Sequence, residues 1–267
     1  MEDELYAQLT NRNIGVITKT QQEKLKNSCV AVFGMGGLGE VVAELLVRSG
    51  IGKIKIIDND KLEATNLNRD VFSFRSTLGE DKIDVAEKFL KDINSELILE
   101  KYDHLDEENI GSIFSGCDVA VLAIDKAKPV IIIGRKAAEM KIPLVEGWAI
   151  PFTNVRVFGE NTNDLETEYD LPTAGKKVTE ISEEEFNAAS FAMLKSLLKI
   201  EGLSAYYNGE AIKRIMANEN PSFAPLVWQT SCAMSLETIK VILRWGKIAW
   251  APDFYVYDPF THKIPKS

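Results

Sequence analysis

Cysteine, histidine and long apolar runs are all scarce in this chain. Its three cysteines, Cys29, Cys117 and Cys232, are far apart and form no Cys-x-x-Cys pair, and its two histidines are His104 and His262. An odd number of widely spaced cysteines argues against a disulfide framework and predicts a reducing, cytoplasmic compartment. No apolar run approaches the roughly 20 residues of a membrane-spanning helix, so we expect no membrane partner.

Positive charge is also in deficit. The chain has 31 Lys and Arg residues against 40 Asp and Glu residues, a formal net charge of −9. This balance argues against a broad nucleic-acid-binding surface and weakens tRNA as a partner. The polar, acidic start, MEDELYAQLTNRN, predicts neither a signal peptide nor a transit peptide.

Apolar strand-like runs alternate with segments of helical spacing over about 120 residues. This alternation predicts an α/β fold with a doubly wound, mostly parallel sheet. The expected strands are Cys29–Phe33, Lys53–Ile57, Leu97–Glu100, Asp118–Ile124, one from Leu144 and Val155–Phe158, and the expected helices are Leu38–Arg48, Lys82–Ile93 and Val130–Met140.

The rest of the chain is less regular. We expect a long loop over 160–180, a helix opened by a Ser182–Glu185 capping box, a short helix over Gly209–Ala217, a long helix from Leu226 to Trp245 and a closing antiparallel hairpin in DFYVYDPFTHKI. The predicted organisation is a helical arm (1–28), a nucleotide-binding core (29–159), a crossover loop with a helical insertion (160–225) and a C-terminal helix and hairpin that complete the same domain (226–267).

A glycine-rich motif, GMGGLG, lies between the first predicted strand and the first core helix. Its glycines, Gly34, Gly36, Gly37 and Gly39, fit the GxGxxG pattern, which allows a tight turn and a close approach of the backbone to phosphate at a helix N-terminus. The pattern predicts nucleotide binding, although a tight turn alone would satisfy it.

A carboxylate, Asp58, ends the second predicted strand, nineteen residues after Gly39. A carboxylate at this place can accept hydrogen bonds from a ribose. The alternative is a strand-end carboxylate that caps the next turn. Asp60 is close by but less favourably placed.

Cations and amides follow in the segment NLNRD and at the start of the next helix. Arg69 offers a planar fork for phosphate oxygens and Lys82 a point charge, while Asn66 offers an amide donor. A dehydrogenase that binds a dinucleotide has little use for them, whereas cleavage of a triphosphate requires fixed cations at the phosphates. The alternatives are a solvated loop arginine and a surface helix lysine.

Asp125 follows the strongly apolar run DVAVLAI. Catalytic groups of open α/β sheets lie at the carboxyl ends of strands, and a carboxylate there could hold Mg²⁺ that bridges phosphate oxygens. The alternative is an N-cap for the helix that begins after Pro129.

The order GMGGLG, IIDND, NLNRD, GEDK and an Asp after the fourth strand resembles the ThiF/MoeB/ubiquitin-activating adenylation superfamily over about residues 11–158, and again in the late helix TSCAMSLETIKVIL with the closing hairpin. The resemblance implies ATP- and Mg²⁺-dependent adenylation of a carboxylate, often the C-terminal glycine of a ubiquitin-like or sulfur-carrier protein. It implies that Asp58 holds the ribose, that Asn66, Arg69 and Lys82 serve the triphosphate, and that Asp125 binds Mg²⁺. It also implies that Arg12 completes the site of a partner subunit in trans, and therefore a homodimer; the alternative for Arg12 is a surface arginine.

The chain departs from many such relatives in its cysteines. It has no paired Cys-x-x-Cys motifs, so we expect no structural zinc, and residues 160–226 contain no cysteine that could form a thioester. We expect Cys232 to be a buried thiol of the late helix and Cys29 and Cys117 to be structural. The sequence therefore predicts that the reaction stops at an acyl-adenylate. The helical segment 180–218 is either a substrate clamp or a packing insertion.

The sequence is compatible with three functions. The first is a carboxylate-adenylating enzyme acting on a carrier protein, a small molecule or a tRNA nucleoside. The second is a non-catalytic partner of such an enzyme. The third is an NAD(P)-dependent dehydrogenase, which only the glycine motif and Asp58 support.

Overall fold

A seven-stranded sheet forms the centre of the computed structural model, which describes residues 2–149, 152–197, 209–216 and 220–262. The strand order is β3-β2-β1-β4-β5-β6-β7. The first five strands pair in parallel, and β6 and β7 extend the sheet antiparallel, which confirms the predicted fold class. The strands are β1 Cys29–Phe33, β2 Lys53–Ile57, β3 Ile98–Tyr102, β4 Val119–Leu122, β5 Leu144–Ala149, β6 Thr153–Phe158 and β7 Tyr255–Tyr257.

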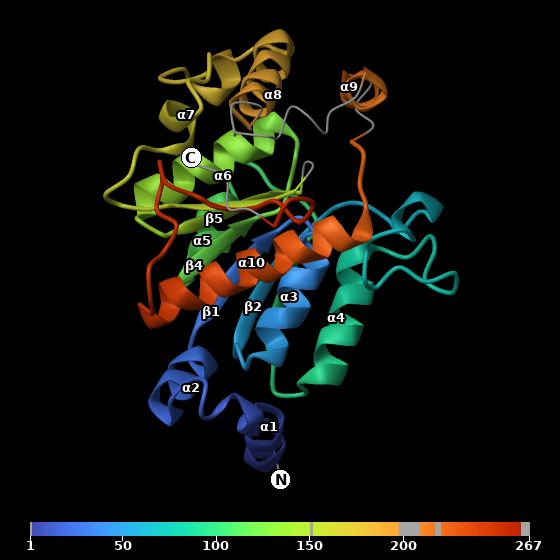
Figure 1. The fold of residues 1–267 in the computed structure, drawn as a ribbon, viewed down its shortest axis with the longest axis vertical. Coiled ribbons are helices and arrows are strands. Elements are labelled where there is room, and N and C mark those ends of the chain that lie inside the picture. The colour runs from blue at the N-terminus through green and yellow to red at the C-terminus, as the bar shows by residue number, and fades with distance from the viewer. Residues whose placement is uncertain (1, 150–151, 198–208, 217–219, 263–267) are drawn as a thin grey trace.

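Helices cover both faces of the sheet (Figure 1). Helices α3, α4 and α10 lie on the face toward the viewer, and α5 and α6 lie behind it, with α7 and α8 beyond α6. The helices are α1 Glu2–Thr10, η1 Asn11–Asn13, α2 Lys19–Lys26, α3 Gly39–Arg48, η2 Ala64–Asn66, α4 Lys82–Ile93, α5 Ile110–Phe114, α6 Ala127–Met140, α7 Leu165–Glu168, η3 Val178–Glu180, α8 Glu183–Leu197, α9 Gly209–Met216 and α10 Ala224–Leu243.

The two large apolar cores of the described residues lie on the two faces of the sheet, and a third, small cluster contains Phe152, Leu197 and Val256. All five residues of β1 are buried, as expected for a central parallel strand. Successive side chains alternate between the faces: Ala31 and Phe33 pack with α5, α6 and α8, whereas Val30 and Val32 pack with α3, α4 and α10. The sheet thus fixes the carboxyl ends of β1, β2, β4 and β5 relative to one another.

One predicted element differs from the structure. The segment 160–180 is not one long loop, because α7 and η3 form within it. Glu166 of α7 makes a bidentate ion pair with Arg135 of α6, at 2.6 and 2.9 Å, and accepts a hydrogen bond from the Thr173 hydroxyl. These contacts fix a segment whose polar composition resembles a loop.

The predicted closing hairpin is described only as far as its first strand and its turn. The first strand, β7, pairs antiparallel with β6. Residues 259–262 are turn, and 263–267 lie outside the described residues. Strand β7 thus pairs with the edge of β6 that β5 leaves free.

The predicted capping box of α8 is confirmed. The Ser182 N–H donates to the Glu185 carboxylate at 2.9 Å, and the Glu185 N–H donates to the Ser182 hydroxyl at 3.3 Å. Phe186, Ala189 and Met193 of α8 pack into the core against α6. At least this part of the insertion therefore has a packing role.

No helix in the described part of the chain is long and apolar enough to cross a membrane.

Candidate active site

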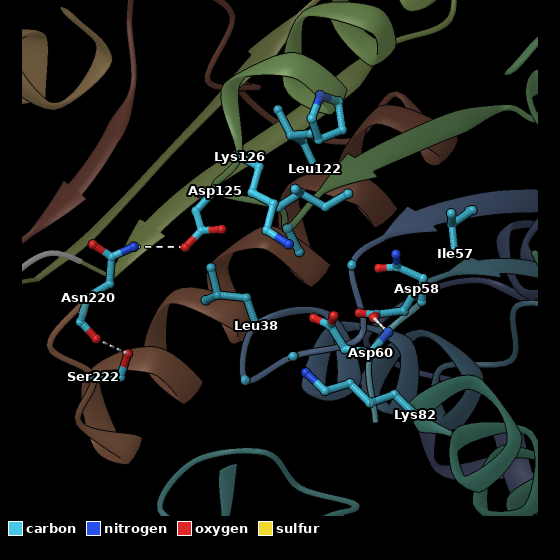
Figure 2. Close-up of a pocket in the computed structure, with 18 of the residues that line it drawn as sticks. Leu38, Ile57, Asp58, Asp60, Lys82, Leu122, Asp125, Lys126, Asn220 and Ser222 are labelled. Carbon is cyan, nitrogen blue, oxygen red and sulfur yellow. Dashed lines mark hydrogen bonds between the residues drawn. The ribbon is translucent and has the colours of Figure 1, made fainter. Parts of the chain in front are cut away.

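A cavity of about 700 Å³ opens at the carboxyl ends of β1, β2, β4 and β5. Figure 2 shows Asp125 and Asn220 on one side of it and Asp58, Asp60 and Lys82 on the other, with Leu38 between them. All the residues predicted from the glycine motif to Asp125, except Gly39, line this cavity. Ligands of open α/β sheets bind at this place in the topology.

The glycine motif forms the tight turn that leads from β1 into α3. Gly34 has φ +94, and a Cβ there would lie 2.5 Å from the Ala123 carbonyl oxygen. A Cβ on Gly39 would lie only 1.8 Å from the Gly34 carbonyl oxygen. The N-cap, Leu38, makes no side-chain cap bond, so within the described residues no side chain caps the N-terminus of α3, which faces the cavity. An anion is stabilised at such a terminus.

Asp58 joins the end of β2 to the glycine turn. Its carboxylate accepts hydrogen bonds from the Met35 N–H at 2.6 Å and from the Asp60 N–H at 2.8 Å. The second bond is the turn-capping contact of the alternative role. Because the side chain is only half-buried and lines the cavity, both roles are compatible with its position.

Arg69 lies against the glycine turn. Its Cγ would be 2.8 Å from a Cβ on Gly37, so the glycine is needed for this approach. The guanidinium Nη1 donates to the Thr65 carbonyl oxygen and the Asn68 carboxamide oxygen, both at 2.9 Å. The side chain is 26% exposed, which is inconsistent with a freely solvated loop arginine.

Lys82 is the first residue of α4, and its side chain is only 9% exposed. A surface helix lysine, the alternative, is therefore excluded. Its Nζ lies 3.9 Å from the Cβ position of Gly36 and so faces the glycine turn. The backbone N–H of Lys82 donates to the Asp60 carbonyl oxygen at 3.1 Å, which ties the start of α4 to the end of β2.

Asn66 supports the loop that carries Arg69. It is buried, its side-chain oxygen accepts a hydrogen bond from the Glu63 N–H at 2.9 Å, and its carbonyl oxygen accepts from the N–H groups of Arg69 and Asp70. Asn66 lines the cavity as well.

Asp125 lies just beyond β4 and is exposed to the cavity. It does not cap α6, because the N-cap is Lys126 and makes no side-chain cap bond. Instead its Oδ2 accepts a hydrogen bond from Asn220 Nδ2 at 2.8 Å (Figure 2). Asn220 lies 95 residues away in sequence, and nothing in its local pattern predicts this contact.

Two buried carboxyl groups lie next to the cations, and no motif of the sequence predicts either as part of the site. Asp70 has a fully buried side chain 3.6 Å from Lys82 Nζ and 3.7 Å from Arg69 Nε. Glu40, in the first turn of α3, is 0% exposed and accepts a hydrogen bond from the Phe72 N–H at 2.8 Å. Their positions next to Arg69 and next to Gly39 are the only sequence signals that could have indicated them.

Burial raises the pKa of both carboxyl groups. The pKa of Glu40 rises to about 8, and the negative charge of Asp70 adds to the effect of burial. For Asp70, burial raises the pKa and the charges of Lys82 and Arg69 oppose the rise.

Part of the cavity lining is apolar. Ile57, Leu105, Leu122 and Ile124 line the cavity, together with His104. The Asp103 carboxylate lies 2.7 Å from His104 Nδ1 and raises the pKa of that histidine. Such a surface suits a planar apolar ring.

Arg12 lies outside this cavity. It is exposed in η1, and the neighbouring Asn13 donates to the Ser49 carbonyl oxygen at the C-terminal end of α3. The glycine turn lies at the other end of that helix. Figure 1 likewise shows α1 and α2 at the end of the molecule opposite α9.

The cysteines lie away from the cavity as well. Cys29 and Cys117 are buried, with 3.6 Å between their sulfur atoms. The prediction that Cys232 is buried is wrong, because it lies on an exposed side of α10. Partial burial still raises the pKa of its thiol, so it is not an activated nucleophile.

Known proteins share both this fold and parts of this sequence. A model of the ThiF family matches residues 10–266. The tRNA threonylcarbamoyladenosine dehydratase of Bacillus subtilis is 36% identical over 137 residues, which are 51% of this chain and 54% of that protein. Molybdopterin-synthase adenylyltransferase of Haemophilus influenzae is 28% identical over 227 residues, 85% of this chain and 79% of that protein. Sulfur carrier protein adenylyltransferase of Thermus thermophilus is 35% identical over 143 residues, 53% of each.

Solved structures also resemble this fold. PaaA has a TM-score of 0.70 at 21% identity, over 96% of this chain and 80% of PaaA. The dehydratase TcdA of E. coli, solved in complex with ATP, has a TM-score of 0.52 at 29% identity, over 54% of this chain and 60% of TcdA. The chain thus spans about half the length of several relatives. Since the family model covers nearly the whole chain, this protein belongs to the ThiF family.

Proposed function

We propose that this protein binds ATP in the cavity and transfers its AMP moiety to a carboxylate, most specifically the C-terminal glycine of a ubiquitin-like or sulfur-carrier protein. The observation that carries the proposal is the convergence of the glycine turn, Arg69, Lys82 and Asp125 on one cavity. The ATP complex of the related TcdA supports the choice of nucleotide. The names of the adenylyltransferase relatives support the reaction.

The cavity offers ATP an apolar part and a charged part. In this proposal the base lies near Leu105 and Ile124, the ribose binds Asp58, and the phosphates meet the glycine turn. Arg69 and Lys82 neutralise the phosphate oxygens.

The reaction needs no general base. A free carboxyl group is already ionised at neutral pH, and one of its oxygens attacks the α-phosphorus of ATP. The new bond joins that oxygen to phosphorus, the bond to the β-phosphate oxygen breaks, and pyrophosphate leaves. The barrier lies in bringing two anions together, which Arg69 and Lys82 lower by their fixed positive charge.

Asp125 would hold the Mg²⁺ that resemblance to the family implies. No three His, Cys, Asp or Glu side chains of the described residues form a cage, but Mg²⁺ binds through one or two carboxylates together with substrate phosphates. A single cavity-exposed carboxylate fits that donor set. When bound, the ion neutralises charge on the phosphates and on the leaving pyrophosphate.

The proposed assembly is a homodimer. Arg12 is exposed at the far end of α3 from the cavity of its own subunit, so it can serve ATP only from a second copy. We therefore propose that Arg12 acts in trans, which mixing two inactive variants can test.

A tRNA nucleoside carboxylate is the second candidate substrate. The 36% identity to the Bacillus subtilis dehydratase favours it, whereas the net charge of −9 argues against it. Arg69 and Lys82 argue against a dehydrogenase, and the intact Asp125 and Arg69 argue against a non-catalytic partner.

Pyrophosphate release from Mg·ATP tests the reaction, measured with and without a panel of glycine-terminated carriers and unmodified or threonylcarbamoylated tRNA. We expect pyrophosphate release to depend on the carrier and to be abolished by Asp125→Ala and by Lys82→Ala. Lys88→Ala is the control, because Lys88 is exposed on the same helix as Lys82, and it should leave release unchanged. Release that depends only on tRNA would instead select the second candidate.

Mixed dimers of Arg12→Ala and Lys82→Ala should regain activity, since one composite site contains both native residues. No recovery would contradict the role of Arg12 in trans.

A further inference from the structure

The phosphate side of the cavity rests on two ionisable groups that water does not reach. The side chain of Asp70 is 0% exposed and lies between Lys82 Nζ and Arg69 Nε. Glu40 is also 0% exposed, and its Oε1 and both carboxylate oxygens of Asp70 make no hydrogen bond within the described residues. Buried carboxyl oxygens without hydrogen bonds are costly, so the presence of three of them next to two cations calls for a function.

We propose that Glu40 and Asp70 form a buried carboxyl pair that positions Arg69 and Lys82 and sets the net charge with which the cavity meets the phosphates. This inference rests on the proposed function, because it takes the phosphates of ATP as the anions that the two cations bind. Asp70 and Glu40 are positioning residues here, since neither is among the residues that line the cavity.

The distances from the Asp70 carboxylate to the two cations allow it to hold them without competing with a bound phosphate. Ion pairs of 3.6 and 3.7 Å are longer than charge-assisted hydrogen bonds of about 2.8 Å. Asp70 therefore attracts both cations but leaves their N–H groups able to bond phosphate oxygens. With only this carboxylate charged, the cluster of Asp70, Arg69 and Lys82 has one net positive charge.

The charge of Glu40 would cancel that net positive charge. The groups that face Glu40 are Asp70 from the loop before α4, Lys82 from α4, Asp58 from the end of β2 and the Phe72 N–H. Burial and the two aspartates favour its neutral form, and Lys82 and the Phe72 N–H oppose them. The pKa of about 8 keeps Glu40 protonated at neutral pH and ionised in mild alkali.

Binding of a polyanion must therefore depend on pH. Phosphates near Glu40 favour its protonated form, so ATP binding takes up a proton wherever free Glu40 is ionised. By linkage, ATP affinity falls as the pH rises above about 8, by up to about tenfold per pH unit. His104 lines the same cavity and also titrates, so it must be removed from the comparison.

Calorimetric titration with Mg·ATP between pH 7 and pH 9.5 tests the charge role. All proteins carry His104→Gln, and the series compares native Glu40 with Glu40→Gln and with Glu44→Gln, which lies one turn further along α3 in an exposed pair with Arg48. We expect the Kd to rise by about tenfold from pH 7 to pH 9 with native Glu40 and with Glu44→Gln, with proton uptake near pH 8, and to stay level with Glu40→Gln. Equal pH profiles in all three would overturn the inference. No binding of ATP at any pH would instead contradict the proposed function.

Asp70→Asn tests the positioning role. This variant removes a negative charge, so we expect ATP to bind at least as tightly, while pyrophosphate release slows by about tenfold or more because the cations are no longer aligned. A fall in affinity with an unchanged rate at saturation would contradict positioning. Thermal unfolding of each variant shows whether it is folded. If Asp70→Asn does not fold, the pH profile of Glu40→Gln still tests the inference.

Discussion

Glu40 makes the stability of the fold depend on pH in a way that one substitution can remove. Its pKa is about 8 in the folded protein against an ordinary value of 4.5. Between these values the folded protein keeps a proton that the unfolded chain releases, so the free energy of unfolding decreases as the pH rises. This contribution is complete below pH 4.5 and is lost as the pH rises through about 8.

The size of the effect follows from the two pKa values. Each pKa unit corresponds to about 1.4 kcal/mol, so the loss is at most about 5 kcal/mol, and relaxation of the site around the charged group reduces the expected loss to about 2–3 kcal/mol. Glu40→Gln cannot ionise, and its side-chain oxygen can still accept the Phe72 N–H. Relative to the native protein, we expect the variant to have similar stability at pH 5 and to be about 2–3 kcal/mol more stable at pH 8.5.

Urea denaturation at pH 5, 6.5 and 8.5 measures this difference. The range stays above the titration of Glu100 and Glu185, whose cationic partners lower their pKa values to about 2. Glu44→Gln is the control, and its stability difference from the native protein should not change with pH. A pH-independent difference for Glu40→Gln as well would refute the reasoning.

Two further predictions concern the turn and the opposite side of the cavity. Gly39→Ala places a Cβ 1.8 Å from the Gly34 carbonyl oxygen, so we expect a loss of several kcal/mol in chemical denaturation and no ATP binding, whereas Gly36→Ala, with its nearest contact at 3.9 Å, should change stability by less than about 1 kcal/mol. Asn220→Ala frees the Asp125 carboxylate, so we expect it to lower the Mg²⁺ concentration for half-maximal pyrophosphate release by about twofold to threefold; an unchanged Mg²⁺ requirement would count against the metal role.

The core of the fold could be predicted because its periodicity is local. The strands β1 and β2 and helix α4 have the predicted bounds, since continuous apolar runs and a 3.6-residue repeat each have one simple solution in a parallel sheet. The terminal strand could not be predicted in the same way. The pairing of residues 255–257 with β6 depends on an edge that lies about 100 residues earlier in the sequence.

The site could be predicted only where motifs carry it. Arg69 and Lys82 were expected to meet phosphates, and the structure brings both to the glycine turn. Asp70 and Glu40 were not expected, because an ionisable side chain in a loop or a first helical turn is usually exposed. Their burial depends on packing between α3, α4 and the loop between β2 and α4. The exposure of Cys232 was missed for a related reason, since apolar and small residues occur around all sides of α10.

One short segment joins the two sides of the cavity, and this determines how a ligand can enter it. Asn220 bonds Asp125, the Ser222 carbonyl oxygen accepts from Asn68, and the Trp228 indole N–H donates to the Arg69 carbonyl oxygen at 2.7 Å. The contacts at Asn68 and Asn220 are exposed, and exposed hydrogen bonds contribute little stability. The Trp228 bond is exposed as well, but it comes from α10, and the buried Ser231 of that helix donates from its hydroxyl to the Leu38 carbonyl oxygen at 3.1 Å. The segment before α10 can therefore release Asp125 without moving Arg69, so a phosphate chain can reach Asp125 while the cations stay in place.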